Sequence, residues 1–284
     1  MKVEIFDVQH GFCALVTTPG QNTILMDCGS SAGQSLLTYW QPGWMLASRG
    51  IRTVDELIVS HADDDHLRGF PSLNRYNVNV HWVSTNPDLS PQTIRSLKPE
   101  APREPVEQFL RHLHRQRQSS NPRSLFIPMG PPEHDITVDK YWVRHSPGSS
   151  IQDLNNLSLV TFISYQGLRI IFPGDIEEPA WRILLGSHEF KQRLQTVNVF
   201  VAPHHGRKNG YFGEVFRYCS PDLVVFSDKA VQHDTQETAS LYGQHTRGVN
   251  FGNQRTKRVL TTRNNGTITF ASQPRGFNVQ VTKA

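Results

Sequence analysis

The chain has 284 residues, of which 37% are hydrophobic and 19% charged, and its formal net charge is +4. This length can bury a full core as one large α/β domain, and no apolar run approaches the ~20 residues that span a bilayer. Three cysteines are too few, and odd in number, for a disulfide framework. We therefore expect a soluble globular protein with no membrane partner, whose positive charge permits an anionic substrate without indicating one.

Apolar and charged side chains alternate over residues 1–8. This pattern favours a first strand over a signal peptide, which needs a continuous apolar stretch. A cytoplasmic location is the expectation that follows. Further strands are predicted at 13–17, 23–26, 57–60 and 78–84, and a helix, interrupted near Pro42, is predicted over 34–48.

Residues 86–132 are rich in proline and basic residues, and they are predicted to be an insertion. Apolar side chains recur at helical spacing between 103 and 118, which predicts a helix there. The polar face of this helix carries Arg103, Arg111, Arg115 and Arg117. A solvated face is the favoured interpretation, and a surface along a nucleic-acid backbone is the alternative.

The strand pattern resumes in the second half of the chain. Strands are predicted at 141–145, 158–165, 168–172, 197–202 and 223–227, and helices near 178–186 and 235–244. This order favours two β-sheets packed face to face with helices outside. We expect residues 1–284 to form one such α/β domain.

A cluster of metal-binding side chains follows the apolar run 57–59. The loop from Ser60 to His66 contains His61, Asp63, Asp65 and His66. Imidazole and carboxylate groups together favour a catalytic cation site. A solvated turn is an alternative, and a calcium loop is disfavoured because Leu67 stands where an oxygen ligand should continue the series.

Two later strands also end in groups that can bind metal. Asp175 follows the apolar strand at 168–172, and His204 and His205 follow the strand at 197–202. Each alone is a weak signal, because a turn also places polar residues there. Three strand ends with such side chains together indicate one site.

These motifs resemble those of the metallo-β-lactamase superfamily, and more narrowly the hydrolase domain of the ComEC DNA-uptake proteins. The matching segments are 61–66, 173–176 and 203–206, with further likeness at 6–11, 25–29, 155–160 and a terminal hairpin at 263–268. The resemblance implies an αββα sandwich with two metal ions at one edge of the sheets.

The resemblance also implies roles for individual residues. His61 and Asp63 would bind one metal, Asp65 and His66 the other, and Asp175 would bridge both. One of His204 and His205 would complete the second site, and His204 is favoured. Asp27 would steady the loop as an acid behind the ligands.

This sequence departs from the family pattern at two positions. Asp63 stands where many members have a histidine, and the histidine usual before the bridging acid is missing; His145 and Asn155 are the candidates to replace it. Because carboxylates make the first site harder, manganese competes with zinc as the metal.

Positive and amide side chains near the ligands suggest the substrate. Arg68, Arg207 and Lys208 form a candidate phosphate clamp together with Asn209, although a solvated rim is the alternative. His233 is a candidate general acid. Hydrolysis by a metal-activated water therefore favours a phosphodiesterase or nuclease acting on DNA or another nucleic acid.

Other functions remain open on the sequence alone. A phosphodiesterase of cyclic or signalling nucleotides is the first alternative, and a catalytically weak scaffold within a multi-protein assembly is the second. A redox enzyme of the same fold is disfavoured because the expected flavin partner domain is absent from the sequence. Protein partners in an assembly are a further expectation.

Overall fold

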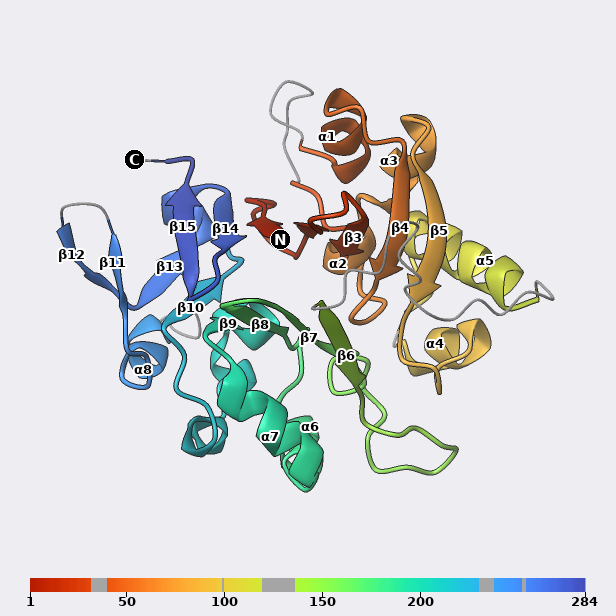
Figure 1. The fold of residues 1–284 in the computed structure, drawn as a ribbon. Coiled ribbons are helices and arrows are strands. Elements are labelled where there is room, and N and C mark those ends of the chain that lie inside the picture. The colour runs from red at the N-terminus through yellow and green to blue at the C-terminus, as the bar shows by residue number, and fades with distance from the viewer. Residues whose placement is uncertain (32–39, 99, 119–135, 230–237, 252–253, 284) are drawn as a thin grey trace.

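The computed structural model describes residues 1–31, 40–98, 100–118, 136–229, 238–251 and 254–283. Within these ranges, two large mixed sheets face each other with helices on their outer sides (Figure 1). One sheet has seven strands in the order β15-β14-β1-β2-β3-β4-β5, and the other has six in the order β13-β10-β9-β8-β7-β6. The αββα sandwich expected from the sequence is confirmed.

The seven-stranded sheet joins both ends of the chain. Its strands are β1 (Lys2–Ile5), β2 (Ala14–Thr17), β3 (Thr23–Met26), β4 (Thr53–Ile58), β5 (Asn79–Ser84), β14 (Ile268–Ser272) and β15 (Phe277–Val281). The helices near it are α1 (Pro42–Ser48), α2 (Asp64–Leu67), α3 (Phe70–Arg75), α4 (Pro91–Leu97) and α5 (Glu104–Gln118).

The six-stranded sheet is built mainly from the second half of the chain. Its strands are β6 (Thr137–Tyr141), β7 (Val160–Tyr165), β8 (Leu168–Phe172), β9 (Val199–Val201), β10 (Leu223–Phe226) and β13 (Val259–Thr261). The remaining helices are α6 (Glu178–Leu184), α7 (His188–Thr196), α8 (Ala239–Gly243) and α9 (Thr262–Asn265), and β11 (Val249–Phe251) pairs with β12 (Gln254–Lys257) as a separate ribbon.

Alternation along the strands divides the apolar side chains between two cores. In β2, Ala14 and Val16 join Ile163 in a core between the sheets, whereas Leu15 joins Phe109 of α5 in a core under the helices. Successive strand residues point to opposite faces, so a strand covered on both sides is apolar throughout. Each fully buried Val, Leu, Ile or Phe stabilises the fold by roughly 1.5–3 kcal/mol.

Parallel pairing places several loops at the same edges of the sandwich. Strands β3, β4 and β5 run parallel to one another, and so do β8, β9, β10 and β13. The segments that follow β4, β8, β9 and β10 therefore leave the C-terminal ends of their strands, where ligand sites of α/β sheets usually form.

The structure corrects several local expectations. The strand expected at 141–145 ends at Tyr141, because Trp142 and His145 leave the sheet and donate hydrogen bonds to Asp88. The segment 263–268 is not a hairpin: it contains the one-turn helix α9, whose Asn264 N–H bonds the Thr261 hydroxyl, and then enters β14. Helix α7 is not among the sequence-based expectations.

Some of the expected elements are described only in part. Of the helix at 34–48, residues 42–48 form α1, and 34–39 lie outside the described residues. Of the insertion at 86–132, residues 91–97 form α4 and 104–118 form α5, while 119–132 lie outside them. None of the described helices has the length and apolar character needed to cross a membrane.

Helix α5 closes part of the edge of the seven-stranded sheet. The Gln116 carboxamide bonds Val83 of the edge strand β5 twice, accepting from its N–H at 2.7 Å and donating to its carbonyl at 2.9 Å. The side chain thus makes the two hydrogen bonds that the backbone of a neighbouring strand would make.

Candidate metal centre

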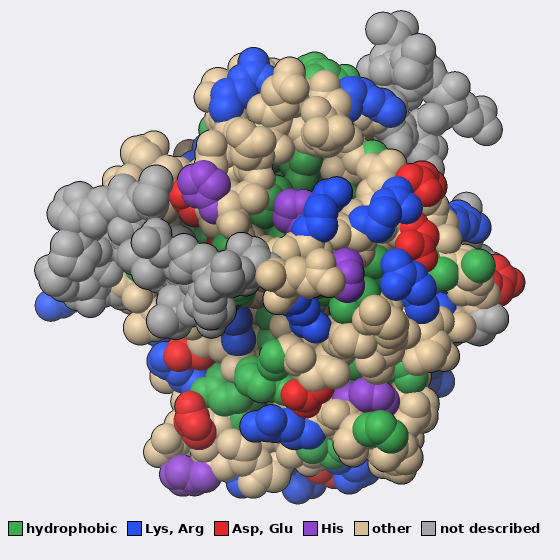
Figure 2. All heavy atoms as spheres, turned by 90° about the vertical axis from the view of Figure 1, so that its right-hand side faces the viewer, with side chains coloured by type: hydrophobic (Ala, Val, Ile, Leu, Met, Phe, Trp, Pro, Cys, Tyr) green, Lys and Arg blue, Asp and Glu red, His purple; other side chains and the backbone are tan. Residues whose placement is uncertain are grey.

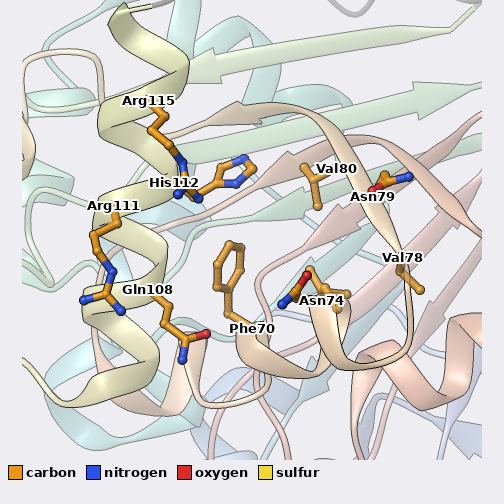
Figure 3. Close-up of a pocket in the computed structure, with 10 residues that line it drawn as sticks. Phe70, Asn74, Val78, Asn79, Val80, Gln108, Arg111, His112 and Arg115 are labelled. Carbon is orange, nitrogen blue, oxygen red and sulfur yellow. The ribbon is translucent and has the colours of Figure 1, made fainter.

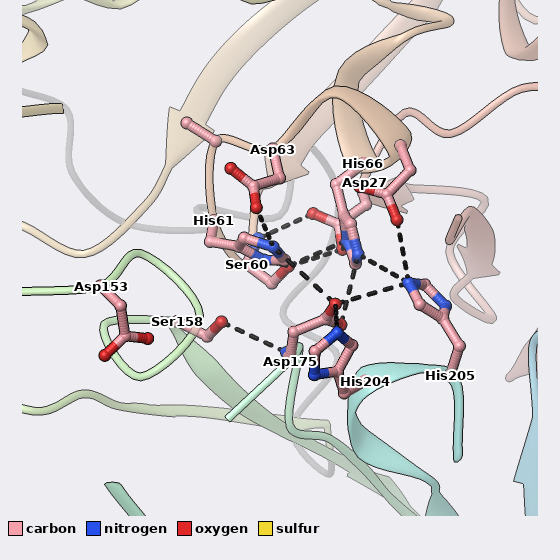
Figure 4. Close-up of polar contacts among 12 residues, drawn as sticks. Asp27, Ser60, His61, Asp63, His66, Asp153, Ser158, Asp175, His204 and His205 are labelled. Carbon is pink, nitrogen blue, oxygen red and sulfur yellow. Dashed lines mark hydrogen bonds and ion pairs between the residues drawn. The ribbon is translucent and has the colours of Figure 1, made fainter. Parts of the chain in front are cut away.

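Four residues from three loops meet at the edge of the sandwich. Asp65 and His66 lie on α2, Asp175 follows β8, and His205 follows β9. Each offers one ligand atom, and these atoms lie within 4.8 Å of one another (Figure 4). The His66 Nε2 atom lies 3.3 Å from Asp175 Oδ1, and His205 Nε2 lies 3.1 Å from Asp65 Oδ2. We call these four residues the central cluster.

Hydrogen-bonding groups outside the central cluster fix the orientation of its two histidines. Asp27 accepts from the N–H and the hydroxyl of Ser60, at 2.7 and 2.8 Å, and its Oδ2 atom lies 2.8 Å from His66 Nδ1. The Nδ1 atom of His205 lies 3.0 Å from the Ser227 carbonyl. Because each Nδ1 faces an acceptor, each Nε2 is directed at the cluster, as in metal-binding histidines.

A second group surrounds the other side of Asp175. The Asp175 Oδ2 atom lies 3.9 Å from His61 Nε2 and 3.9 Å from His204 Nε2, and His61 Nε2 lies 3.7 Å from Asp63 Oδ2. We call His61, Asp63 and His204 the outer group. Asp175 therefore stands between two sets of ligands.

A buried nitrogen atom without a hydrogen-bond partner indicates that these residues fit a cation. The His61 Nε2 atom is fully buried and has no hydrogen-bond partner among the described residues. Buried polar atoms in proteins are almost always satisfied. An unpartnered imidazole nitrogen that faces two carboxylates fits a metal ligand.

The backbone at the two neighbouring histidines is left-handed. His204 and His205 have φ values of 51° and 56°, and Asp27, behind the cluster, has φ 54°. Such values are uncommon for residues other than glycine and persist only where the surroundings enforce them. The turn directs His205, rather than the favoured His204, to Asp65, while the Nδ1 atom of His204 lies 3.1 Å from Glu177.

Charges within the central cluster shift its pKa values strongly. Burial disfavours the charged form of His205, but Asp175 and Asp65 outweigh burial and raise its pKa to about 9. Asp175 and Asp27 likewise raise the pKa of His66 well above its usual value against the effect of burial. The pKa of Asp175 is well below its usual value despite burial, because His205 and His66 favour the carboxylate.

The outer group differs in protonation. Burial lowers the pKa of His61, with a further contribution from His66, and burial also lowers the pKa of His204. Both imidazoles therefore favour the neutral form that metals bind. Asp63 is ion-paired with Lys98, which follows α4: its Nζ atom lies 2.7 Å from Asp63 Oδ1 and 2.8 Å from the Ala62 carbonyl.

Several predicted residues lie elsewhere or have other partners. Arg68 is ion-paired with Asp64 at 2.9 Å, an i,i+4 pair. Asn209 donates to Glu177, and Lys208 is exposed beside it. Arg207 lies at the rim, where its charge helps to lower the pKa of His10 and His204, after burial as the main cause.

The two candidates for the missing ligand have other recorded contacts. His145 Nδ1 lies 3.2 Å from the Ser149 hydroxyl, and Asn155 contributes its backbone carbonyl to Ser158. His233 lies outside the described residues. The buried neighbour Asn156, which was not predicted, accepts from the backbone N–H groups of residues 177 and 180, beyond Asp175.

Sequence analysis also missed His10. Its Nε2 atom lies 3.3 Å from Asp65 Oδ2, and its ring centre lies 5.0 Å from that of His205. Gly11 makes this approach possible, because a Cβ atom there would lie 2.1 Å from the Asp65 carbonyl oxygen. Segment 6–11 was noted for its family likeness, but no role was assigned to His10 within it.

The fold and the two ligand groups define a protein of the metallohydrolase type. Residues 7–143 match the model of the metallo-beta-lactamase superfamily. Over this segment the chain matches the metallo-β-lactamase superfamily, and its described residues have the fold of that superfamily with a candidate His/Asp metal site.

Two curated relatives indicate which branch of the superfamily the chain resembles. The chain is 24% identical over 246 residues to "Competence protein ComA" of Neisseria gonorrhoeae, covering 86% of this chain and 30% of that protein. It is 23% identical over 306 residues to "ComE operon protein 3" of Bacillus subtilis (strain 168), covering 95% of this chain and 33% of that protein. The chain thus resembles the ComEC-type branch and spans about a third of the length of these relatives.

A solved structure supports the fold alone. CmlA, a diiron β-hydroxylase from Streptomyces venezuelae, superposes with a TM-score of 0.52 at 11% identity. The match covers 94% of this chain and 53% of CmlA.

Proposed function

We propose that this protein is a metal-dependent phosphodiesterase that holds two divalent cations, zinc or manganese, and acts on DNA or another nucleic acid. The observation that carries the proposal is the position of Asp175. Its Oδ1 atom lies 3.3 Å from His66 Nε2 and its Oδ2 atom 3.4 Å from His205 Nε2, both in the central cluster. The same Oδ2 atom lies 3.9 Å from the Nε2 atoms of His61 and His204 in the outer group. A carboxylate shared in this way is the bridge that two neighbouring cations require.

The chain divides its ligands between the two positions. Asp65, His66 and His205 would hold one cation with Asp175, and His61, Asp63 and His204 would hold the other. His204 would then take the ligand position for which the sequence offered His145 and Asn155. When bound, two divalent cations supply a nucleophilic water at neutral pH and neutralise developing negative charge.

Residues around the ligands would orient a phosphodiester. Arg207 and the exposed Lys208 are the proposed phosphate contacts. Arg68 is not included because its guanidinium is ion-paired with Asp64. His10 stands beside Asp65 and is one-third exposed, so a substrate at the cluster would reach it. Carboxylate, imidazole and guanidinium groups together suit phosphate better than an uncharged amide or thioester.

The test combines metal content with hydrolysis. The purified chain, Asp175→Ala and the matched control Asp222→Ala are analysed by metal mass spectrometry and then assayed on a bis-aryl phosphodiester, single-stranded DNA and a cyclic dinucleotide. Asp222 precedes the N-terminal end of β10, at the opposite end of that strand from Ser227.

We expect about two metals per chain, with metal and hydrolysis both lost in Asp175→Ala and kept in the control. Cleavage of the cyclic dinucleotide without cleavage of DNA would indicate the signalling-nucleotide alternative. Inert protein after loading with manganese and zinc would contradict the enzyme proposal and favour a scaffold.

A further inference from the structure

A cleft lies on the side of the molecule that carries the edge strand β5. Helices α3 and α5 and the start of β5 enclose a cavity of about 440 Å³ (Figure 3). Figure 2 turns this side of the molecule toward the viewer and shows Lys and Arg side chains close to His side chains on it. The volume lies within the roughly 300–1,000 Å³ of typical small-molecule sites.

Positive charge lines one wall of the cleft. Arg111 and Arg115 lie four residues apart on α5, which places them on one face of the helix, with His112 between them. None of the lining residues is acidic. Arg111 donates to Glu104 outside the cleft, whereas Arg115 has no acidic partner within 4 Å in the described part of the chain.

An aromatic side chain forms the base of the cleft. Phe70 packs edge-to-face against Phe109 and against His112, with ring centres 5.6 and 5.8 Å apart. Burial, together with the charge of Arg115, lowers the pKa of His112, so its ring is neutral at pH 7. Asn74, Asn79 and Gln108 add carboxamides around this apolar surface.

The cleft is separate from the metal centre. Strand β5 runs parallel to β4, with Asn79 opposite Thr53 and Ser84 opposite Ile58. The metal-binding loop follows the C-terminal end of β4, whereas the cleft lies at the N-terminal end of β5. At about 3.3 Å per residue, the length of the strand separates the two by roughly 17 Å.

We propose that this cleft is a second, metal-independent binding site for a nucleotide. The two guanidinium groups would bind the phosphate, the Phe70 region would contact the base, and the carboxamides would bond its polar edge. The same chemistry is offered by a free mononucleotide and by one nucleotide unit of a polynucleotide. A wall without acidic residues, beside an aromatic side chain, fits the charge and the planar ring of such a ligand.

The test measures binding by calorimetry to the full chain with its metals and to Asp175→Ala. The probes are AMP, adenosine, inorganic phosphate and a short single strand of deoxyadenylate. Arg111→Gln/Arg115→Gln removes both charges, and Arg182→Gln/Arg247→Gln removes two other exposed arginines as the matched control. Phe70→Leu removes the aromatic ring while keeping an apolar side chain.

We expect AMP to bind the wild type and Asp175→Ala equally and to bind Arg111→Gln/Arg115→Gln at least about tenfold more weakly, since the double substitution removes both charged donors to the phosphate. Phe70→Leu should weaken AMP but not inorganic phosphate. Displacement of AMP by the strand identifies a polynucleotide unit as the ligand, and a lack of displacement identifies a free nucleotide.

Three outcomes overturn the proposal. They are no AMP binding to the wild type, equal weakening of AMP binding by the two double arginine substitutions, and loss of AMP binding in Asp175→Ala. The last would place the nucleotide at the metal centre. Hydrolysis is assayed separately with the aryl phosphodiester, so failure here leaves the proposed enzyme untouched. Melting curves check that each variant is folded.

Discussion

The Nδ1 atom of His66 lies 2.8 Å from the Asp27 carboxylate, and this contact directs its Nε2 atom to Asp175, 3.3 Å away. Asp27 is thus a positioning residue for a proposed ligand. We predict that Asp27→Asn weakens metal binding by about 10–100-fold, because such partners orient the imidazole and raise its basicity. Competition with a chelating dye measures the affinity.

Asp55→Asn is the matched control for that variant. Asp55 accepts hydrogen bonds from the N–H and hydroxyl of Thr23, away from the ligands. If both variants kept wild-type metal affinity, the positioning role of Asp27 would be wrong.

Substituting each of the two adjacent histidines should remove a different one of the two proposed cations. We predict that His205→Ala loses the cation of the central cluster and that His204→Ala loses the cation of the outer group, each retaining about one metal per chain. Of these two histidines, His205 has its Nε2 atom 3.1 Å from Asp65 Oδ2, whereas the His204 imidazole contacts Glu177. Metal mass spectrometry counts the ions, and equal loss of both ions in both variants would contradict the division of ligands.

Chelator-treated protein should lose stability as pH rises. The pKa of His205 is about 9 in the folded chain, against 6.5 for an unperturbed imidazole, and that of His66 is also raised. The stabilisation from a raised histidine pKa is fully present below the unfolded value and is lost as pH rises through the folded value. The urea concentration at the midpoint of unfolding should therefore decrease as the pH is raised from about 6.5 to 9. His205→Gln should flatten this slope, and an unchanged slope would refute the assignment.

Lys98 competes with a cation for Asp63. Because its Nζ atom lies 2.7 Å from Asp63 Oδ1, we predict that Lys98→Met tightens binding at the outer group. Asp63 is 38% exposed, so the ion pair is worth at most about 1 kcal/mol and the gain should not exceed about fivefold. Lys2→Met, which removes a lysine paired with Glu4, serves as the control in the same titration.

A buried ion pair near the end of β10 should matter for stability. Arg263 Nη1 lies 2.6 Å from Asp228 Oδ2, but the groups are not aligned as a hydrogen bond, so the contact is chiefly electrostatic. We predict that Arg263→Met lowers the free energy of unfolding by about 1–3 kcal/mol, because it removes the charged partner of a buried carboxyl group whose pKa burial already raises to about 6. Asp228→Asn/Arg263→Met should recover part of that loss in urea unfolding.

The sequence could predict the positions of the ligands because each follows an apolar strand. His61, Asp175 and His205 all lie after strands that were foreseeable from short apolar runs between turn signals. The choice between His204 and His205 was not foreseeable, because it depends on two successive left-handed residues and their tertiary contacts. The Arg68–Asp64 pair carried a local signal, the i,i+4 spacing, that favours an ion pair over a phosphate contact.

Contacts between distant segments left no local periodicity in the sequence from which they could be predicted. Lys98 reaches Asp63 from 35 residues away, and its position depends on how α4 ends against the metal-binding loop. His10 meets Asp65 only because Gly11 allows the two backbones to approach closely. Such contacts follow from packing, which local periodicity does not encode.

The carboxamide of Gln116 also bears on self-association. An exposed edge strand is a template on which a second chain can add its own strand, and such pairing leads to aggregation. At Val83 of β5, both backbone groups that could receive a foreign strand are already bonded to Gln116. Helix α5 therefore guards this edge of the sheet, and shortening the helix before Gln116 would expose a site for chain-to-chain strand pairing.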